Sequence, residues 1–241
     1  MLLLDRVMAK YERRIAREIA RAMNQYANAL GDSTKRPAIL VKHKARMKSL
    51  LDRLWMESGV DMANHIGKQE KAIKGWQKKQ EEGDIPSTLI ANNVMQSWIA
   101  RYGGAKIVGI ARTTQDDVTS IISDSIEQGL SERQTAKAIR SLSAFKGSSR
   151  SGTIARTETH SAANVSAHAT AKAAGVTMRR EWVASKSERT RKAHRDADGQ
   201  IVGMDEPFKI DGYDLMYPSD YGSGAPARLT INCRCAVAYI L

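Results

Sequence analysis

The chain has 241 residues, of which 42% are hydrophobic and 27% charged, so a packed protein of one or two domains is expected and a disordered chain is not. Two cysteines are too few for a disulfide framework, and no apolar run approaches the length of a membrane span. The net charge is +12, and residues 1–150 carry most of it, with 26 basic and 16 acidic side chains. Such a one-sided excess indicates either a nearby polyanion, most simply nucleic acid, or a well-solvated helical surface.

The start of the chain predicts two long amphipathic helices. In the first, apolar residues recur every three or four positions, at Leu4, Met8, Tyr11, Ile15, Ile19, Ala22 and Tyr26. The second has the same kind of stripe, at Leu40, Met47, Leu50, Leu51, Leu54 and Trp55. Because amphipathic helices with a thin core of their own are often completed by a partner, we expect residues 1–100 to pack against another subunit.

Basic residues cover the rest of these two helices. Residues 1–50 contain 12 basic and only 4 acidic side chains. The candidate DNA-contacting residues are Arg13, Arg14, Arg17, Arg21, Lys42, Lys44, Arg46 and Lys48. We expect them to contact phosphates of double-stranded DNA nonspecifically and in a salt-dependent way, because no basic-zipper or helix-turn-helix pattern for reading bases is present.

Shorter helices are expected further along. The pair Gly103-Gly104 should break the helix that precedes it. Ser131 with Gln134 has the spacing of a capping box and predicts the start of a short helix. Glycine and serine then cluster in residues 147–152, which is typical of a linker or mobile loop.

The last third of the chain mixes helix and strand. A helix rich in small residues is expected from Thr153 to Ala174, and apolar alternation from 178 to 185 predicts a half-buried strand. Asp198-Gly199 is a tight-turn signal, and the apolar end of the chain is expected to form a strand beside the first. Long ordered loops connect these elements and need polar contacts to hold them. The side chains expected to provide these contacts are Arg189, Arg191, His194, Asp198, Asn232 and Arg234.

These patterns together predict an α+β protein. We expect a basic helical region over residues 1–140, a linker or mobile loop over 141–152, and a small loop-rich α+β domain over 153–241. On the helix that opens this domain, Arg156 and His160 share one face while Glu158 lies well round from them. We interpret Arg156 and Glu158 as side chains that hold neighbouring loops by charge-assisted bonds, rather than as catalytic groups.

One constellation resembles a metal site. Cys233 and Cys235 would share a face of an extended strand, and with His194 they would offer three zinc ligands. A fourth ligand could come from Asp196, Asp198 or His160. One Cys-x-Cys unit with one histidine departs from the paired motifs of common structural zinc sites, so we expect no resident cofactor and interpret the cysteines as small buried apolar side chains.

No catalytic residue is assigned from the sequence. A thiol nucleophile beside His194 is conceivable, but catalytic triads are recognised by geometry and the spacing gives no support. A nuclease would need carboxylates gathered around a divalent ion, whereas the aspartates here lie in ordinary turn sequences. Phosphate loops, dinucleotide fingerprints and zinc-protease helices are absent from the sequence.

Four short motifs follow one another in a characteristic order near the end of the chain. They are Ala155-Arg156-Thr157-Glu158, Arg189-Thr190-Arg191 followed by His194, Asp198-Gly199, and Asn232-Cys233-Arg234-Cys235. In this order they resemble the C-terminal domain of phage Mu F-type minor head proteins, also called phage head morphogenesis proteins, over roughly residues 115–241. The residues of this chain that match the motifs are Arg156, Thr157, Glu158, Arg189, Arg191, His194, Asp198, Gly199, Asn232, Cys233 and Cys235. Ser187 stands where the family often has a second acidic residue.

The resemblance implies a minor head protein of a tailed phage or prophage, needed for head morphogenesis. The resemblance implies the portal protein and a major capsid or scaffold protein as partners. It implies no membrane association. The implied location is the virion, near packaged DNA, with assembly in the host cytoplasm. Some family domains precede a toxin domain; because six residues follow Cys235, we expect no such effector here. The alternative is a metal-dependent nuclease or thiol hydrolase that uses His194 and the Cys233/Cys235 pair.

Overall fold

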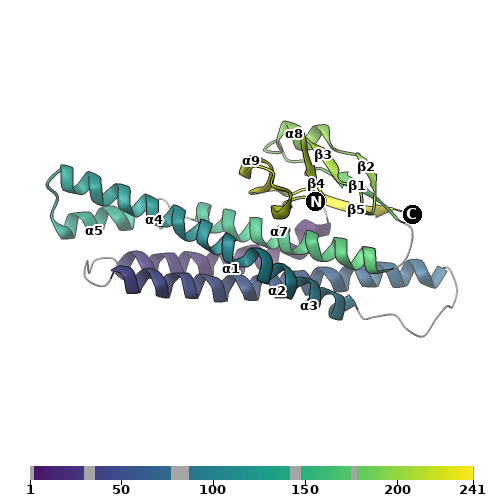
Figure 1. Ribbon diagram of the computed structural model, residues 1–241, viewed down its shortest axis with the longest axis horizontal. Helices are drawn as coiled ribbons and strands as arrows, with labels where there is room; N and C mark the ends of the chain where they lie inside the picture. The colour runs from purple at the N-terminus through teal and green to yellow at the C-terminus, as the bar shows by residue number, and fades with distance from the viewer. Residues whose placement is uncertain (1–2, 30–35, 77–86, 142–147, 175–177, 241) are drawn as a thin grey trace.

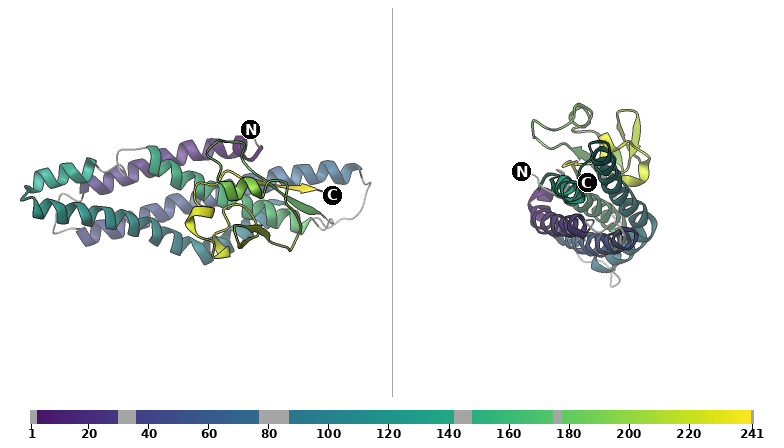
Figure 2. Two further views of the ribbon diagram at one scale, coloured as in Figure 1. Left: turned by 90° about the horizontal axis from the view of Figure 1, so that it is seen from above. Right: turned by 90° about the vertical axis from the view of Figure 1, so that its left-hand side faces the viewer.

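In the part of the chain that the structure describes, helices lie side by side in an elongated bundle, and the strands sit on one flank of it. The computed structural model describes residues 3–29, 36–76, 87–141, 148–174 and 178–240 (Figure 1). The helices are α1 (Leu3–Ala29), α2 (Arg36–Trp76), α3 (Ser87–Trp98), α4 (Gly104–Glu127), α5 (Glu132–Ser141) and α7 (Ser148–Ala173). Seen end-on, the helices form a compact group with the strand-containing part on one side (Figure 2).

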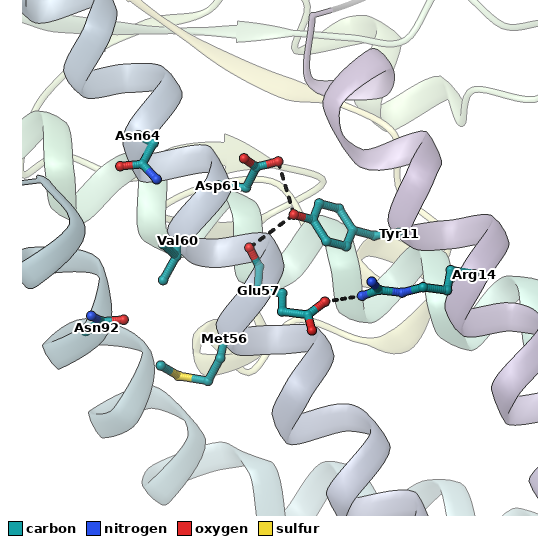
Figure 3. Close-up of a pocket in the computed structure, with 8 residues that line it drawn as sticks. All are labelled: Tyr11, Arg14, Met56, Glu57, Val60, Asp61, Asn64 and Asn92. Atoms are coloured by element: carbon teal, nitrogen blue, oxygen red, sulfur yellow. Dashed lines mark hydrogen bonds and ion pairs between the residues drawn. The ribbon is translucent and has the colours of Figure 1, made fainter.

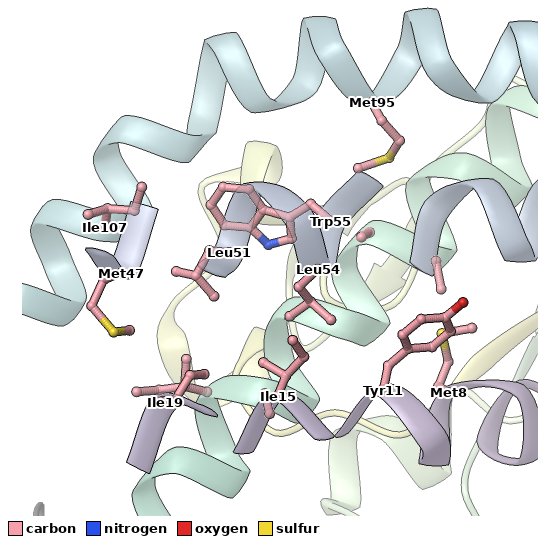
Figure 4. Close-up of a cluster of buried hydrophobic side chains, with 14 of the residues drawn as sticks. Met8, Tyr11, Ile15, Ile19, Met47, Leu51, Leu54, Trp55, Met95 and Ile107 are labelled. Atoms are coloured by element: carbon pink, nitrogen blue, oxygen red, sulfur yellow. The ribbon is translucent and has the colours of Figure 1, made fainter. Parts of the chain in front are cut away.

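The two predicted apolar stripes form most of the bundle core. In α1 the buried positions are Met8, Tyr11, Ile15, Ile19, Ala22, Met23 and Tyr26. From α2 they meet Met47, Leu51, Leu54, Trp55 and Met62 (Figure 4). Both helices therefore follow the periodicity that predicted them, because each buries its apolar face and leaves its basic face to solvent.

A third helix of the same chain covers these stripes. Helix α7 packs against α1, α2 and α3. The apolar stripes are therefore buried within the chain itself, and contact of residues 1–100 with another subunit stays a prediction. Ala155, Ala162 and Ala163 are fully buried on α7, and their small side chains allow the neighbouring helices to approach closely.

The start of α7 also corrects the predicted linker. Residues 148–152 belong to the helix, and Ser151 is buried, so this part of the predicted loop is wrong. Serine and glycine are poor helix formers, but tertiary burial overrides such weak preferences. Residues 142–147 of the predicted linker lie outside the described part of the chain.

Helices α3 and α4 are joined into one rod by a π-helical segment, η2 (Ile99–Gly103). The predicted break at Gly103-Gly104 is therefore wrong. Gly103 is buried, and a Cβ atom there would lie 2.9 Å from a ring carbon of Trp55. This glycine serves close packing against the indole ring rather than helix termination. The capping box is confirmed, because Ser131 N–H donates to Gln134 Oε1 at 2.8 Å and Gln134 N–H donates to Ser131 Oγ at 3.4 Å.

The C-terminal part contains a three-stranded antiparallel sheet in the order β2-β1-β5. Its strands are β1 (Arg179–Val183), β2 (Ile201–Gly203) and β5 (Ala236–Ile240), and β5 pairs with β1 as predicted. A two-stranded ribbon of β3 (Phe208–Ile210) and β4 (Tyr213–Leu215) follows β2. The short helices are α8 (Lys192–Asp196), η3 (Tyr221–Ser223) and α9 (Ala227–Thr230). The predicted α+β class, with long helices first and a small loop-rich part last, is confirmed.

A second, smaller core fills this part of the molecule. Trp182 and Phe208 are both fully buried and their rings are 5.4 Å apart in an edge-to-face arrangement. Arg180 is buried in the same region, and it donates to the carbonyls of Gly203, Glu206 and Met216. This arginine joins β1 to two loops, which is how a domain with few regular elements keeps its backbone carbonyls satisfied. Within the described ranges, no helix combines the length and apolar character needed to cross a membrane.

The bundle core gives a direct stability prediction. Leu54→Ala should lower the free energy of unfolding by about 2–5 kcal/mol, because the side chain is fully buried and its loss leaves a cavity. Val41→Ala, on the same helix but 67% exposed, is the matched control and should change it by less than about 0.5 kcal/mol. Urea unfolding followed by circular dichroism measures both, and equal effects would contradict this assignment of the core.

Candidate functional site

Glu158 points from α7 into the bundle and forms a buried ion pair. Its Oε2 accepts from Lys106 Nζ on α4 at 2.9 Å and from Trp55 Nε1 on α2 at 3.0 Å. Both charged side chains are almost fully buried, at 4% and 6% exposure. The Lys106 ammonium also lies 4.6 Å from the ring centre of Tyr221. Glu158 therefore joins three helices, as a structural residue and not as a free acid.

Arg156 and His160 lie on another face of α7 and meet Glu12 of α1. Arg156 Nε and His160 Nε2 lie 3.2 and 3.0 Å from the Glu12 carboxylate. Arg234 lies 3.5 Å from the same carboxylate. Burial raises the pKa of Glu12, but the hydrogen bond and charge of His160 and the charges of Arg234 and Arg156 outweigh it and bring this pKa below its ordinary value.

The segment before β5 is fixed by three further motif residues. Asn232 N–H donates to Thr157 Oγ1 at 2.9 Å, and Arg156 donates to the Asn232 side-chain oxygen. Arg191 donates to the carbonyl of Ile231 at 2.6 Å. Asn232 adopts a left-handed conformation, with φ of 60°, which asparagine tolerates better than most residues. These bonds set the position of the two cysteines that follow.

The Asp198-Gly199 turn is confirmed and connects α8 to β2. Gly199 has a φ of 80°, which glycine adopts without strain. Asp198 Oδ1 accepts from the Ala184 amide at 2.8 Å, and its other oxygen pairs with Lys186 at 2.5 Å. Both hydrogen bonds lower the pKa of Asp198, and the bond from Lys186 has the larger effect. Asp198 therefore holds the end of β1 against the turn.

His194, Cys233 and Cys235 come together as one buried cluster. His194 Nδ1 lies 3.5 Å from Cys233 Sγ and 3.4 Å from Cys235 Sγ. All three side chains are buried, and the imidazole packs perpendicular to Trp182 at 5.5 Å. A hydrogen bond with Cys235 lowers the pKa of the Cys233 thiol, and the same contact raises that of Cys235. The three ligand atoms all lie within 4.8 Å of one another, which is close enough for them to share a metal ion. Among the described residues, this cluster is the one group of His, Cys, Asp or Glu side chains with that property.

The expected fourth ligands do not join this cluster. Asp198 is bonded to Ala184 and Lys186, Asp196 pairs with Lys192, and His160 pairs with Glu12. None of these three belongs to the group that could share an ion. The fourth ligand that one of these three residues could have supplied is therefore not found among them.

A cavity of about 360 Å³ lies beside the cluster. Its lining residues are Arg156, Ser185, Ser187, Arg189, Thr190, Arg191, His194, Asn232, Cys233, Arg234 and Cys235. Four of them are arginines, and none is acidic. Most of the motif residues thus border one cationic cavity. Arg189 was predicted to hold a loop. Its side chain is instead exposed at the edge of this cavity and forms no hydrogen bond or ion pair with the described residues.

Further cavities lie on the bundle, of which two are lined by described residues of its long helices. One, of about 610 Å³, is an open groove between α1, α2 and α3, where Tyr11 donates to Asp61 at 3.1 Å and Arg14 pairs with Glu57 (Figure 3). The other, of about 380 Å³, lies between α4, α7 and the loop around Tyr221, next to the Lys106–Glu158 pair. Neither cavity contains the group of possible metal ligands found among the described residues.

Seven of the eight candidate DNA-contacting residues are exposed, and Lys44 is half-buried. Arg13, Arg17 and Arg21 follow one another along one face of α1, at four-residue spacing. Arg14 and Lys48 pair with Glu57 and Asp52, and Arg46 donates to Gln25. Part of the basic charge is thus balanced within the bundle.

Three residues that hold the motif residues or the loops beside them in place were not identified from the sequence alone. Glu12 and Lys106 supply the partners of Arg156 and Glu158, and Arg180 holds the loops around β1. Glu12 and Lys106 lie more than 50 residues from their partners, so no local pattern could mark them. Arg180 did carry a signal, because the alternation of β1 places it on the buried face.

The comparison with known families covers the region that holds these motifs. The family described as Phage Mu protein F like protein matches residues 116–238, which is half of the chain. The chain belongs to this family.

Several curated proteins share sequence with this member of the Mu F-like family. Minor head protein GP7 of Bacillus phage SPP1 is 38% identical over 96 residues, which cover 36% of this chain and 28% of that protein. The Enterococcus faecalis protein named NAD(+)--arginine ADP-ribosyltransferase EFV is 26% identical over 251 residues, covering 90% of this chain and 50% of that protein. The uncharacterized protein YqbB of Bacillus subtilis is 24% identical over 162 residues, covering 66% and 52%. The chain thus spans about half or less of the length of these relatives, and no solved structure matches it.

The family match begins inside α4, so α1, α2 and α3 lie outside it. Arg156 and Glu158 lie within the matched region, but their partners Glu12, Trp55 and Lys106 do not. The Mu F-like motif on α7 therefore connects the family domain to helices that the family model does not include.

The buried ion pair predicts a large effect from removing one partner. Glu158→Ala should destabilise the protein by about 3–5 kcal/mol, because the Lys106 charge is left buried without an acceptor. The double variant Glu158→Leu with Lys106→Met should recover much of this loss, since neither charge remains. Thermal and urea unfolding of the three proteins completes the comparison.

The matched control is the exposed pair of Lys192 and Asp196. Lys192→Ala should cost less than about 1 kcal/mol, because surface ion pairs contribute little. If Glu158→Ala were no more costly than this control, the structural role of the buried pair would be disproved.

The lowered pKa of Glu12 predicts a pH-dependent stability. Its stabilising contribution is fully present above the unfolded value, about 4.3, and is lost as the pH falls through the lower folded value. In Glu12→Gln, the free energy of unfolding should therefore fall less steeply than in the wild type as the pH decreases below about 4.3. Arg156→Gln should move this loss to higher pH, because it removes one of the neighbouring positive charges. Unfolding free energies measured between neutral and acidic pH test this, and an unchanged slope in Glu12→Gln would contradict it.

Proposed function

We propose that this protein is a minor head protein of a tailed phage or prophage that acts in head morphogenesis by binding the portal vertex. The observation that carries the proposal is membership of the Mu F-like family together with 38% identity to a minor head protein over 96 residues. Both findings support a phage head protein. Portal binding and contact with packaged DNA go beyond these two findings and are proposed here.

The geometry of the motif residues supports a structural role. Arg156, Thr157 and Glu158 are all engaged in bonds that join separate segments of the chain. Arg191 and Asp198 are likewise bonded to backbone groups. Residues used in this way fix the positions of neighbouring segments, which supports a structural role for the motif.

The proposed partners are the portal protein, a major capsid or scaffold protein, and double-stranded DNA without sequence preference. The proposed location is the virion head, after assembly in the host cytoplasm. The exposed row of Arg13, Arg17 and Arg21 on α1 supports DNA contact, because a regular line of positive charges suits a phosphate backbone.

The first prediction is that the full chain co-purifies with the portal protein of its own phage or prophage when the two are co-expressed. The full chain is needed, because a chain starting at Thr153 would lose α1 and α2 and expose the buried face of α7. Charge reversal of Arg13, Arg17 and Arg21 to Glu tests the bundle surface, and reversal of Lys186, Lys192 and Lys209 to Glu tests the sheet side. Binding should be lost in one of these variants only, and a folded wild-type chain that never retains portal would refute the proposal.

A second prediction concerns DNA. Replacing Arg13, Arg17 and Arg21 with Gln should weaken binding to duplexes of unrelated sequence equally and reduce the salt slope of log Kd by about 3, roughly one per lost phosphate contact. The charge-matched control replaces the exposed Lys186, Lys192 and Lys209 with Gln. Fluorescence anisotropy over a salt series measures both. An equal change in both variants would show only a general charge effect and would contradict a DNA surface on α1.

The second candidate is a metal-dependent nuclease or thiol hydrolase using His194 and the Cys233/Cys235 pair. It is favoured by the closeness of these groups and by the cavity beside them. The activity of one variant, His194→Ala, distinguishes the two functions. Hydrolysis of DNA or thioester that disappears in folded His194→Ala would establish the enzyme, whereas a head protein shows no turnover before or after this change.

A further inference from the structure

We propose that His194, Cys233 and Cys235 bind one zinc ion whose fourth position is open to the arginine-lined cavity. In this arrangement the fourth ligand is a water molecule or a small anion from solution, because no further His, Cys, Asp or Glu of the described residues joins the cluster. The site would be a Cys2His centre that can still exchange one ligand. It is independent of whether the protein binds portal or DNA.

The spacing of the three ligand atoms fits a tetrahedral zinc ion. With Zn–S bonds of about 2.3 Å and a Zn–N bond of about 2.0–2.1 Å, a tetrahedral angle places sulfur and nitrogen about 3.5–3.6 Å apart. The observed separations from His194 Nδ1 are 3.5 Å to Cys233 and 3.4 Å to Cys235. One small ion at the centre of this group therefore needs little rearrangement.

The chemistry of the donor set also favours zinc. Two thiolates with one imidazole suit a borderline-soft divalent ion and not magnesium or calcium, which prefer oxygen ligands. The backbone N–H of Cys235 points at Cys233 Sγ, at 3.4 Å, so this sulfur already receives a donor that stabilises negative charge. Arg191 and Arg234 line the same cavity as the two cysteines and bring positive charge to it.

The site is built by fixed backbone rather than by a mobile loop. Thr157 and Arg191 hold residues 231 and 232 immediately before the first cysteine, and Cys235 adjoins β5. His194 lies in α8, between the end of β1 and the Asp198-Gly199 turn. Preorganised ligands of this kind lower the ordering cost of metal binding.

The open position follows from what surrounds the ligands. Asp196, Asp198 and His160, the residues that could have closed the site, are paired elsewhere. The cavity wall next to the sulfurs instead carries Arg156, Arg189, Arg191 and Arg234. A zinc-bound anion such as phosphate would meet guanidinium donors at this wall, which suits their planar, bidentate hydrogen bonding.

The first test measures metal in the full-length protein, expressed without a histidine tag in zinc-supplemented medium. Elemental analysis and native mass spectrometry should find one zinc per chain, and a chelator should remove it and lower Tm. Cys235→Ser should lose the zinc, while His65→Gln, a histidine outside the cluster, should keep it. If Cys235→Ser does not fold, the wild-type stoichiometry and the chelator response decide alone. A folded wild-type chain without zinc, even after incubation with zinc ions, overturns the proposal.

The second test concerns the open position. Cobalt(II) bound in place of zinc should give thiolate-to-metal charge-transfer bands and the visible bands of tetrahedral cobalt. Adding inorganic phosphate should shift the visible bands, and Arg189→Gln should require several-fold more phosphate for the same shift. Because Arg189 is exposed and borders the cavity, this change leaves the three ligands intact. Cobalt bands that never respond to phosphate, with no exchangeable water detected by paramagnetic relaxation, would overturn the open coordination site.

Discussion

The structure depends on the burial of α7 around almost its whole circumference. The helix packs against α1, α2 and α3 and also carries the strand-containing part. From Ser151 to Ala171 few of its residues reach solvent. Such a position demands small side chains where helices approach and a partner for every polar group. The alanines of α7 meet the first demand. Serines such as Ser166, which donates to the Gly59 carbonyl at 2.7 Å, meet the second in part, because the hydroxyls of Thr159 and Thr170 are buried without a hydrogen-bond partner among the described residues.

The charged residues of α7 divide the remaining contacts between two faces. Glu158 binds inward to α2 and α4, while Arg156 and His160 bind Glu12 on α1 and Arg156 also reaches the loop before β5. A single helix thus carries both the attachment of the small sheet and the closure of the bundle. This explains why a short motif on one helix of the Mu F-like region belongs to the stability of the whole chain, including helices that the family match leaves out.

Local patterns were sufficient for most elements. The stripes of α1 and α2, the alternation of β1, the capping box at Ser131 and the turn at Gly199 all depend on neighbours in sequence, and all were predicted. The burial of α7 on nearly all sides was not predicted, because small residues indicate that a helix packs closely but not how many other elements surround it. The cysteine–histidine cluster could be proposed from the sequence, but the absence of a fourth ligand among Asp196, Asp198 and His160 required the positions of their other partners.

The π-helical segment η2 has a consequence for the phase of the helix that follows it. An α-helix advances by about 100° per residue, so one additional residue in a turn rotates everything beyond it by about that angle. Lys106 lies three residues after η2 and points at Glu158. A regular helix through residues 99–103, shorter by one residue, would aim the ammonium group at a different neighbour. The irregular turn is therefore the device that aligns two otherwise ordinary helices, and its length is as constrained as the identity of the residues it aligns.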